Sequence, residues 1–242
     1  MTGQLALRDA FSSQTANREI KVLNQVIGDD NHLLVARLCQ ARGVAHEALF
    51  QREYFWSTIM ERTSGSQIFP LGSKLPTFQL MNVDGSTIGS DYFQGGKAYL
   101  VAFLCNHCPY VKGSEEMLIA IVNKFAADGL KTVTINSNDA LKYPDDSFDK
   151  MQEKSREMSL PYPYLYDESQ AVARKFDAAC TPEFFLFDSG HTLVYHGTIN
   201  DSPRDPTKVT KDYLSQAIMA VIEGQLPNPQ FVHPLGCSIK WR

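Results

Sequence analysis

The chain has 242 residues, of which 43% are hydrophobic and 21% are charged, and its formal net charge is −4. These values are typical of a soluble globular protein, and the length suits one large domain or one domain with an extension. The acidic balance gives no attraction to nucleic acid or to an anionic membrane, and no apolar run approaches the roughly 18 residues of a membrane helix. We therefore expect neither nucleic acid nor a membrane as a partner.

The amino-terminal segment, Met1–Asp9, lacks the basic region and the apolar core of a signal peptide. The chain contains five cysteines, and an odd number argues against a secreted disulfide framework. We therefore expect a cytoplasmic protein in which any disulfide is transient, catalytic or redox-sensing.

Residues 1–65 are predicted to form a helical extension. Apolar residues recur there at helical spacing, as in Ile20, Leu23 and Ile27, and Cys39 falls on a similar stripe, so it is a predicted core residue. No motif with chemistry is visible in this part. Packing of these helices on the main domain is the simpler interpretation, and a docking surface or a homodimer through them is the alternative.

Residues 66–242 are predicted to form a second domain in which strands alternate with helices. Phe78–Val83 and Ser86–Gly89, joined by Asp84-Gly85, predict a hairpin, and the apolar run Ala98–Leu104 predicts a buried strand. The later predicted elements are a helix ending near Phe125, a strand at 131–136, a helix at 144–158, a strand at 163–166, a short helix at 170–176, a hairpin of 184–188 with 193–195, a helix at 211–223 and an irregular tail at 227–242. This order predicts an α/β fold with a mixed central sheet flanked by helices.

The motif Cys105-Asn106-His107-Cys108 lies where the buried strand ends and a helix begins. Two thiols at this spacing can close a small disulfide ring, and helix amides that point at the first sulfur favour its thiolate. Half of a structural zinc site is the alternative, but the sequence contains no second closely spaced Cys/His pair. The motif therefore favours dithiol redox chemistry, with no metal and no cofactor.

Further motifs accompany this pair in a fixed order. They are Gly72 with Leu75–Leu80, Asp84-Gly85, Phe103–Lys112, Asn136–Asp139, Tyr143-Pro144, Asp146-Ser147, Tyr164–Asp167, Cys180–Asp188 and Gly236–Trp241. In these motifs residues 70–242 resemble the thioredoxin-like superfamily, and most closely its peroxiredoxin-like branch, which is related to alkyl hydroperoxide reductase and thiol-specific antioxidant proteins. The resemblance implies a thioredoxin-like fold with an amino-terminal β-hairpin over residues 66–242, and it does not include residues 1–65.

The resemblance also implies a substrate-binding loop. Thr181-Pro182 matches the loop whose proline is cis and faces the dithiol, which is uncommon for X-Pro bonds in general. If the bond is cis, the Thr181 backbone is expected to be open to pairing with a substrate segment beside Cys105. An ordinary trans proline on an edge strand is the alternative.

Cys105 is the expected nucleophile, because a thiol at the helix start is expected to be more exposed and more acidic than that of Cys108. Cys108 is expected to resolve the mixed disulfide, and His107 either stabilises the Cys105 thiolate or is simply solvated. The chain departs from thioredoxin, since no Trp precedes Cys105 and residues 98–104 contain no acid to accept a proton. A general reductase like thioredoxin is therefore not expected.

Two single cysteines have two interpretations each. Cys180 adjoins the Thr181-Pro182 loop and is either a further redox thiol or a small buried residue. Cys237 either reaches the site as a third thiol, which resolves or relays the disulfide, or belongs to a tail that is anchored by packing.

The predicted function is a thiol–disulfide oxidoreductase, with a protein or small-molecule disulfide or thiol as substrate and a cellular thiol reductant as electron donor. A thiol-dependent peroxidase is one alternative, but Cys105 and Val101 stand where peroxiredoxins carry Thr or Ser and Pro. The other alternative is a copper- or zinc-binding module, in which Cys237, His233 or Cys180 joins the Cys105–Cys108 motif on folding.

Overall fold

The computed structural model describes residues 69–242. The predicted helical extension, its boundary at residue 65 and the expected burial of Cys39 lie outside the described residues. Within the described part, no helix combines the length and the apolar character that crossing a membrane requires.

Within residues 69–242, seven strands form a mixed sheet in the order β2-β1-β5-β4-β3-β7-β8, and two short strands, β6 and β9, pair separately. The strands are β1 (Gln79–Asn82), β2 (Thr87–Gly89), β3 (Ala98–Phe103), β4 (Leu130–Asn136), β5 (Tyr164–Tyr166), β6 (Cys180–Thr181), β7 (Glu183–Asp188), β8 (Leu193–Gly197) and β9 (Cys237–Ser238). β3, β4 and β5 run parallel, whereas β1 and β7 pair antiparallel with β5 and β3.

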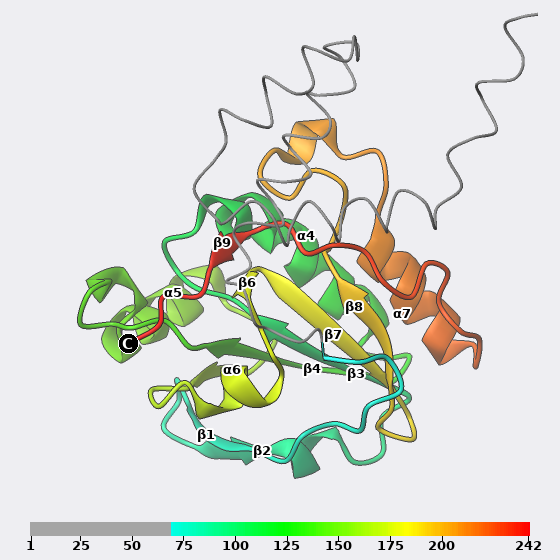
Figure 1. The fold of residues 1–242 in the computed structure, drawn as a ribbon, viewed down its shortest axis with the longest axis horizontal. Coiled ribbons are helices and arrows are strands. Elements are labelled where there is room, and N and C mark those ends of the chain that lie inside the picture. The colour runs from blue at the N-terminus through cyan, green and yellow to red at the C-terminus, as the bar shows by residue number, and fades with distance from the viewer. Residues whose placement is uncertain (1–68) are drawn as a thin grey trace, which may run out of the picture. The chain divides into compact units, whose positions relative to one another are not determined.

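Helices cover both faces of the sheet. They are α4 (Pro109–Phe125), α5 (Phe148–Met158), α6 (Ala171–Lys175) and α7 (Tyr213–Ile222). Figure 1 shows α4 and α7 on one side of the sheet and α6 on the other. Side chains of β3 alternate between the two cores: Leu100 packs with α4 and α7, and Val101 packs with α6. Because both faces are covered, β3 is a continuous apolar run, as the sequence predicts.

The predicted α/β fold and its amino-terminal hairpin are confirmed, and the fold is thioredoxin-like. In the hairpin turn, Gly85 takes the left-handed conformation (φ +86°) and the Asp84 side chain accepts the N–H of Ser86 at 2.8 Å. At the other end of the chain, the Asp212 side chain caps α7 by accepting the N–H of Ser215 at 3.0 Å. Local turn and capping residues therefore set the bounds of these elements.

Two predicted elements differ from the structure. The helix predicted over 144–158 is divided into a 3₁₀ turn, Pro144–Asp146, and α5, because Ser147 is extended (ψ 156°) as the N-cap residue. The tail predicted to be irregular contains β9 (Cys237–Ser238), which pairs antiparallel with β6. A strand of two residues has no periodicity of its own, so its partner decides that it forms.

Candidate dithiol site

The cysteine pair lies just beyond the carboxyl end of β3, in the connection to α4. This edge of an α/β sheet is the usual place for a functional site. Cys105 and Cys108 are both 0% exposed and are not joined in a disulfide. The Cys105 sulfur lies 3.2 Å from the Thr181 hydroxyl, and the Cys108 thiol donates to the Thr181 carbonyl oxygen at 3.1 Å. Folding therefore brings the predicted cysteines and the predicted Thr181 together.

The Thr181–Pro182 peptide bond is cis, which confirms the expectation from the resemblance. A buried carboxylate, that of Glu183, positions the strand before it by accepting the N–H groups of Ala179 and Cys180 at 2.7 and 3.0 Å. The backbone of Thr181 is not open to a substrate in this structure, because Cys237 of β9 pairs opposite it. The sequence expectation of an open edge is thus wrong for the state described.

Helix α4 begins at Pro109, so Cys108 is its N-cap residue. A hydrogen bond from the Cys105 thiol lowers the pKa of Cys108, as do hydrogen bonds from the Cys237 thiol and from the amides of Val111 and Cys237, while burial opposes this effect. These hydrogen bonds favour ionisation of Cys108, which in this structure is a thiol that donates to the Thr181 carbonyl oxygen.

Cys105 is in the opposite environment. Its hydrogen bond to Cys108, its burial and the nearby charge of Asp146 all raise the pKa of Cys105. The sequence interpretation placed Cys105 at the helix start as the more exposed and more acidic thiol. Cys105 and Cys108 are both 0% exposed, so Cys105 is not the more exposed thiol, and the directions of the two pKa shifts favour Cys108 as the more acidic one.

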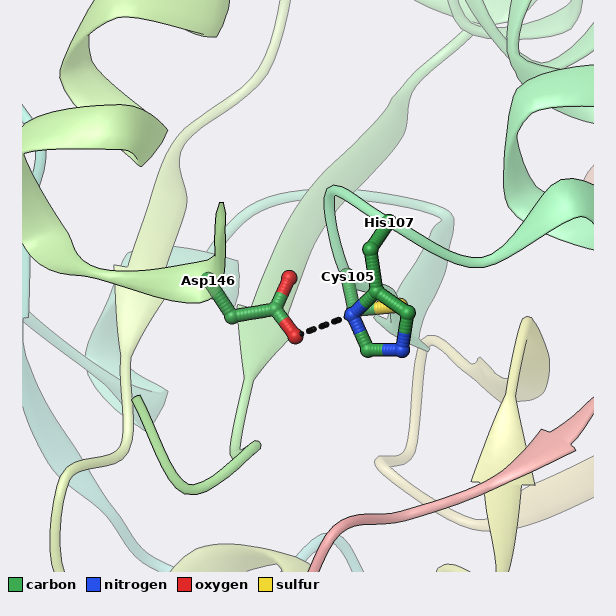
Figure 2. Close-up of side chains that lie close together, drawn as sticks. All are labelled: Cys105, His107 and Asp146. Carbon is green, nitrogen blue, oxygen red and sulfur yellow. Dashed lines mark hydrogen bonds and ion pairs between the residues drawn. The ribbon is translucent and has the colours of Figure 1, made fainter. Parts of the chain in front are cut away.

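His107 and Asp146 form a hydrogen-bonded pair beside Cys105 (Figure 2). His107 Nδ1 lies 2.6 Å from the Asp146 carboxylate, which also accepts the Asn106 N–H at 2.7 Å and an Asn138 amide N–H at 2.8 Å. An ionised carboxylate only accepts, so Nδ1 of His107 donates and the other ring nitrogen is left to exchange protons with solvent or substrate.

The His107 ring is held on a second side as well, because it stacks on Tyr143 with centroids 5.2 Å apart and an interplanar angle of 12°. The interpretation of His107 as a merely solvated side chain is therefore wrong. The ring is fixed in orientation between Tyr143 and Asp146.

Sequence reasoning missed Asp146, because Pro144-Asp145-Asp146-Ser147 has the composition of an ordinary helix start. The polar run Asn136–Asp139, which follows β4, could have indicated this part of the site. The carboxyl ends of the parallel strands β3 and β4 meet at one edge of the sheet, so the run is near the cysteine pair that follows β3. Asn136 of that run donates to the Asp146 carbonyl oxygen at 3.2 Å. Asp146 thus supplies, from another element, the buried acid that residues 98–104 lack.

A metal could use part of this cluster. A sulfur of Cys105, a ring nitrogen of His107 and a carboxylate oxygen of Asp146 lie within 4.8 Å of one another, whereas His233, Cys180 and Cys237 do not join this group among the described residues. Nδ1 of His107 and the Asp146 carboxylate oxygen are 2.6 Å apart, which is shorter than the about 3.3 Å between two ligand atoms around a tetrahedral zinc ion. A metal held by both Nδ1 of His107 and that carboxylate oxygen would require their hydrogen bond to open, whereas Nε2 of His107 could bind a metal with the hydrogen bond intact.

The two remaining cysteines lie on opposite sides of the β6–β9 pair. Neighbouring residues of a strand point to opposite faces, so Cys180 points away from the dithiol that Thr181 contacts. Residues directly opposite each other across two strands share a face, so Cys237, opposite Thr181, lies on the dithiol side. The structure thus brings Cys237 to the predicted site, and it does not bring Cys180 there.

Residues 70–214 match the Redoxin protein family. An uncharacterized conserved protein from Geobacillus kaustophilus is 41% identical, and the match covers 73% of this chain and 95% of that chain with a TM-score of 0.69. A hypothetical protein from Sinorhizobium meliloti is 36% identical over 73% of this chain and 97% of that chain, with a TM-score of 0.68. No curated protein matches the chain. These similarities span the domain that carries the dithiol.

Proposed function

The chain belongs to the redoxin family, and we propose that it is a thiol–disulfide oxidoreductase whose redox centre is the Cys105–Cys108 pair. Family membership and the thioredoxin-like fold support a thiol redox function in general terms. The observation that carries the finer proposal is the unequal environment of two neighbouring thiols, one with a lowered and one with a raised pKa, which share contacts with Thr181. A low-pKa thiol beside a protonated one is the arrangement that disulfide exchange requires.

In the proposed cycle the Cys108 thiolate attacks one sulfur of a substrate disulfide. The substrate S–S bond breaks, a Cys108–substrate mixed disulfide forms, and the released substrate thiolate takes up a proton. Cys105 then loses its proton and attacks the Cys108 sulfur, which closes the Cys105–Cys108 disulfide and releases the second substrate thiol. The substrate gains two electrons and the pair loses two, and a cellular thiol reductant returns them.

His107 is the proposed base for the proton of Cys105. Its ring lies beside the Cys105 sulfur, and Asp146 fixes which nitrogen donates. This assignment reverses the roles that the sequence suggested for the two cysteines, because the amides at the start of α4 favour the Cys108 thiolate rather than that of Cys105.

The first test equilibrates the protein in graded mixtures of reduced and oxidised glutathione, followed by alkylation and peptide mass analysis. Trypsin leaves both cysteines of the pair on one peptide, residues 98–112, and places Cys180 on residues 176–204. We expect a reversible disulfide within the first peptide and loss of disulfide reduction in both C105S and C108S, whereas C180S, whose side chain points away, retains it. A pair that never oxidises, or turnover that survives C108S, would refute the proposal.

Metal binding is a second candidate function, favoured by the cluster of Cys105, His107 and Asp146. Soft thiolate and imidazole ligands suit Cu(I) and zinc. The test is titration of the reduced protein with each ion under anaerobic conditions, with H107A as the matched variant. Stoichiometric binding that H107A abolishes supports this function, and a protein that ignores both ions excludes it.

A further inference from the structure

The carboxyl-terminal segment of the chain occupies the strand edge next to the dithiol. Strand β9 pairs antiparallel with β6, and Cys237 is directly opposite Thr181. Gly236 approaches so closely that a Cβ built on it would lie 2.3 Å from the Thr181 carbonyl oxygen. That same carbonyl oxygen accepts the Cys108 thiol at 3.1 Å. The segment Gly236–Ser238 therefore covers the backbone that faces the redox pair.

Cys237 presents its thiol to the Cys108 sulfur. The pairing register puts its side chain on the same face as that of Thr181, whose hydroxyl lies 3.2 Å from the Cys105 sulfur. Hydrogen bonds from the Cys237 thiol and amide add to that from Cys105 in lowering the pKa of Cys108. Thr181 thus lies beside three cysteines: its carbonyl oxygen accepts the Cys108 thiol, its hydroxyl lies against the Cys105 sulfur, and Cys237 is opposite it on β9.

The tail after Cys237 is fixed in place. Ile239 is buried and donates its N–H to the Ala179 carbonyl oxygen at 2.9 Å, and the Lys240 carbonyl oxygen accepts the Asp139 N–H at 2.8 Å. Trp241 packs under the guanidinium of Arg174, 4.5 Å from the ring centroid. Anchored on this side, Cys237 is held in position and needs no search to reach Cys108.

We propose that Cys237 is a third redox-active residue, which exchanges with the Cys105–Cys108 disulfide and connects the buried pair to thiols in solution. This inference rests on the proposed function. Cys105 and Cys108 are fully buried, whereas Cys237 is half-buried, so an external thiol or disulfide meets Cys237 first. The tail thus behaves as an internal substrate on the strand edge of Thr181.

In the exchange step the Cys237 thiolate attacks the Cys108 sulfur of the oxidised pair. The Cys105–Cys108 bond breaks as the Cys108–Cys237 bond forms, and the electron pair leaves on the Cys105 sulfur. The proton lost by Cys237 is replaced by one taken up at Cys105, so the step changes no net oxidation state. An external thiolate then attacks the Cys237 sulfur, which forms a mixed disulfide with Cys237 and releases the Cys108 sulfur as a thiolate. A second external thiol attacks that mixed disulfide, leaves with the first as an external disulfide, and returns Cys237 to the thiol, so that all three cysteines are reduced.

The decisive experiment uses full-length C105S, which prevents the pair from closing. The protein is oxidised with glutathione mixtures, alkylated and digested with trypsin. A Cys108–Cys237 disulfide joins residues 98–112 to residues 212–240, whereas Cys180 is on residues 176–204. We expect the first cross-link in C105S and in C105S/C180S, and its absence in C105S/C237S.

A rate measurement on the wild-type pair tests the relay itself. We expect C237S to slow reduction of the Cys105–Cys108 disulfide by reduced glutathione at least tenfold, while C180S reacts at the wild-type rate. Circular dichroism and thermal unfolding verify that each variant is folded, and Cys237→Ala provides a second variant if C237S is not.

The two proposals fail in different ways. If the wild-type protein forms the Cys105–Cys108 disulfide normally but the C105S variant never forms the Cys108–Cys237 cross-link, the relay is refuted and the proposed function stands. An unchanged reduction rate in C237S also refutes the relay. A wild-type protein in which Cys105 and Cys108 never pair refutes the proposed function itself.

Discussion

Replacing Asp146 by Asn tests whether the buried carboxylate organises the dithiol site. The carboxylate accepts three hydrogen bonds, from Asn106, His107 and Asn138, and Asn presents an N–H₂ group where one oxygen stood. His107 can adapt by exchanging its ring proton. Asn138 cannot turn its amide without cost, because its oxygen accepts the Lys240 N–H at 2.8 Å.

One buried donor therefore loses its acceptor, which costs about 1–3 kcal/mol. For a chain of this size each kcal/mol lowers the melting temperature by about 2–4 °C, so we expect D146N to melt about 2–12 °C below the wild type. Removing the negative charge also removes one of the causes that raise the pKa of Cys105, so the Cys105 thiol becomes more acidic in D146N.

The assays are thermal unfolding of the reduced proteins and the pH dependence of thiolate absorbance in the C108S background. The matched control is D145N, which makes the same charge change at the neighbouring, exposed position. An equal loss of stability in D145N and D146N would refute the reasoning, and so would an unchanged Cys105 titration in D146N.

Three further predictions follow from the same site. The pKa of Cys108 is lowered, so we expect thiolate absorbance of the reduced C105S protein to persist to pH values below the ordinary thiol range. The thiolate absorbance of C108S should not persist there, because the pKa of Cys105 is raised. The reverse order would indicate that Cys105 is the nucleophile. Gly236→Ala places a Cβ against the Thr181 carbonyl oxygen, so it should lower the free energy of unfolding by about 1–3 kcal/mol. It should also lower the yield of the Cys108–Cys237 cross-link in the C105S background. A yield equal to that of C105S alone would contradict the close approach. We expect the protein to consume hydrogen peroxide no faster than an ordinary thiol of the same pKa does, since Cys105 and Val101 replace the residues that peroxiredoxins carry. Fast, saturable consumption that C108S abolishes would favour a peroxidase instead.

The sequence by itself determined most of the sheet and its helices. The apolar run Ala98–Leu104, the Asp84-Gly85 turn and the helical spacing after Pro109 are local patterns, and each matches an element of the structure within a few residues. Local backbone preferences and burial periodicity act over a few residues, so a single chain displays them. The cysteine pair and the Thr181-Pro182 motif were also visible, the second through a family resemblance.

Only the tertiary structure decided the chemistry around the pair. Which sulfur faces the helix amides depends on where α4 begins, and that point lies at Cys108 rather than Cys105. Asp146 reaches the site from a 3₁₀ turn 38 residues beyond Cys108, and Cys237 reaches it from a strand of two residues at the end of the chain. Neither has a local pattern that marks its role. Burial, charge and hydrogen bonding set the pKa of a thiol, and these are properties of neighbours in space, so they follow from the packing of distant segments.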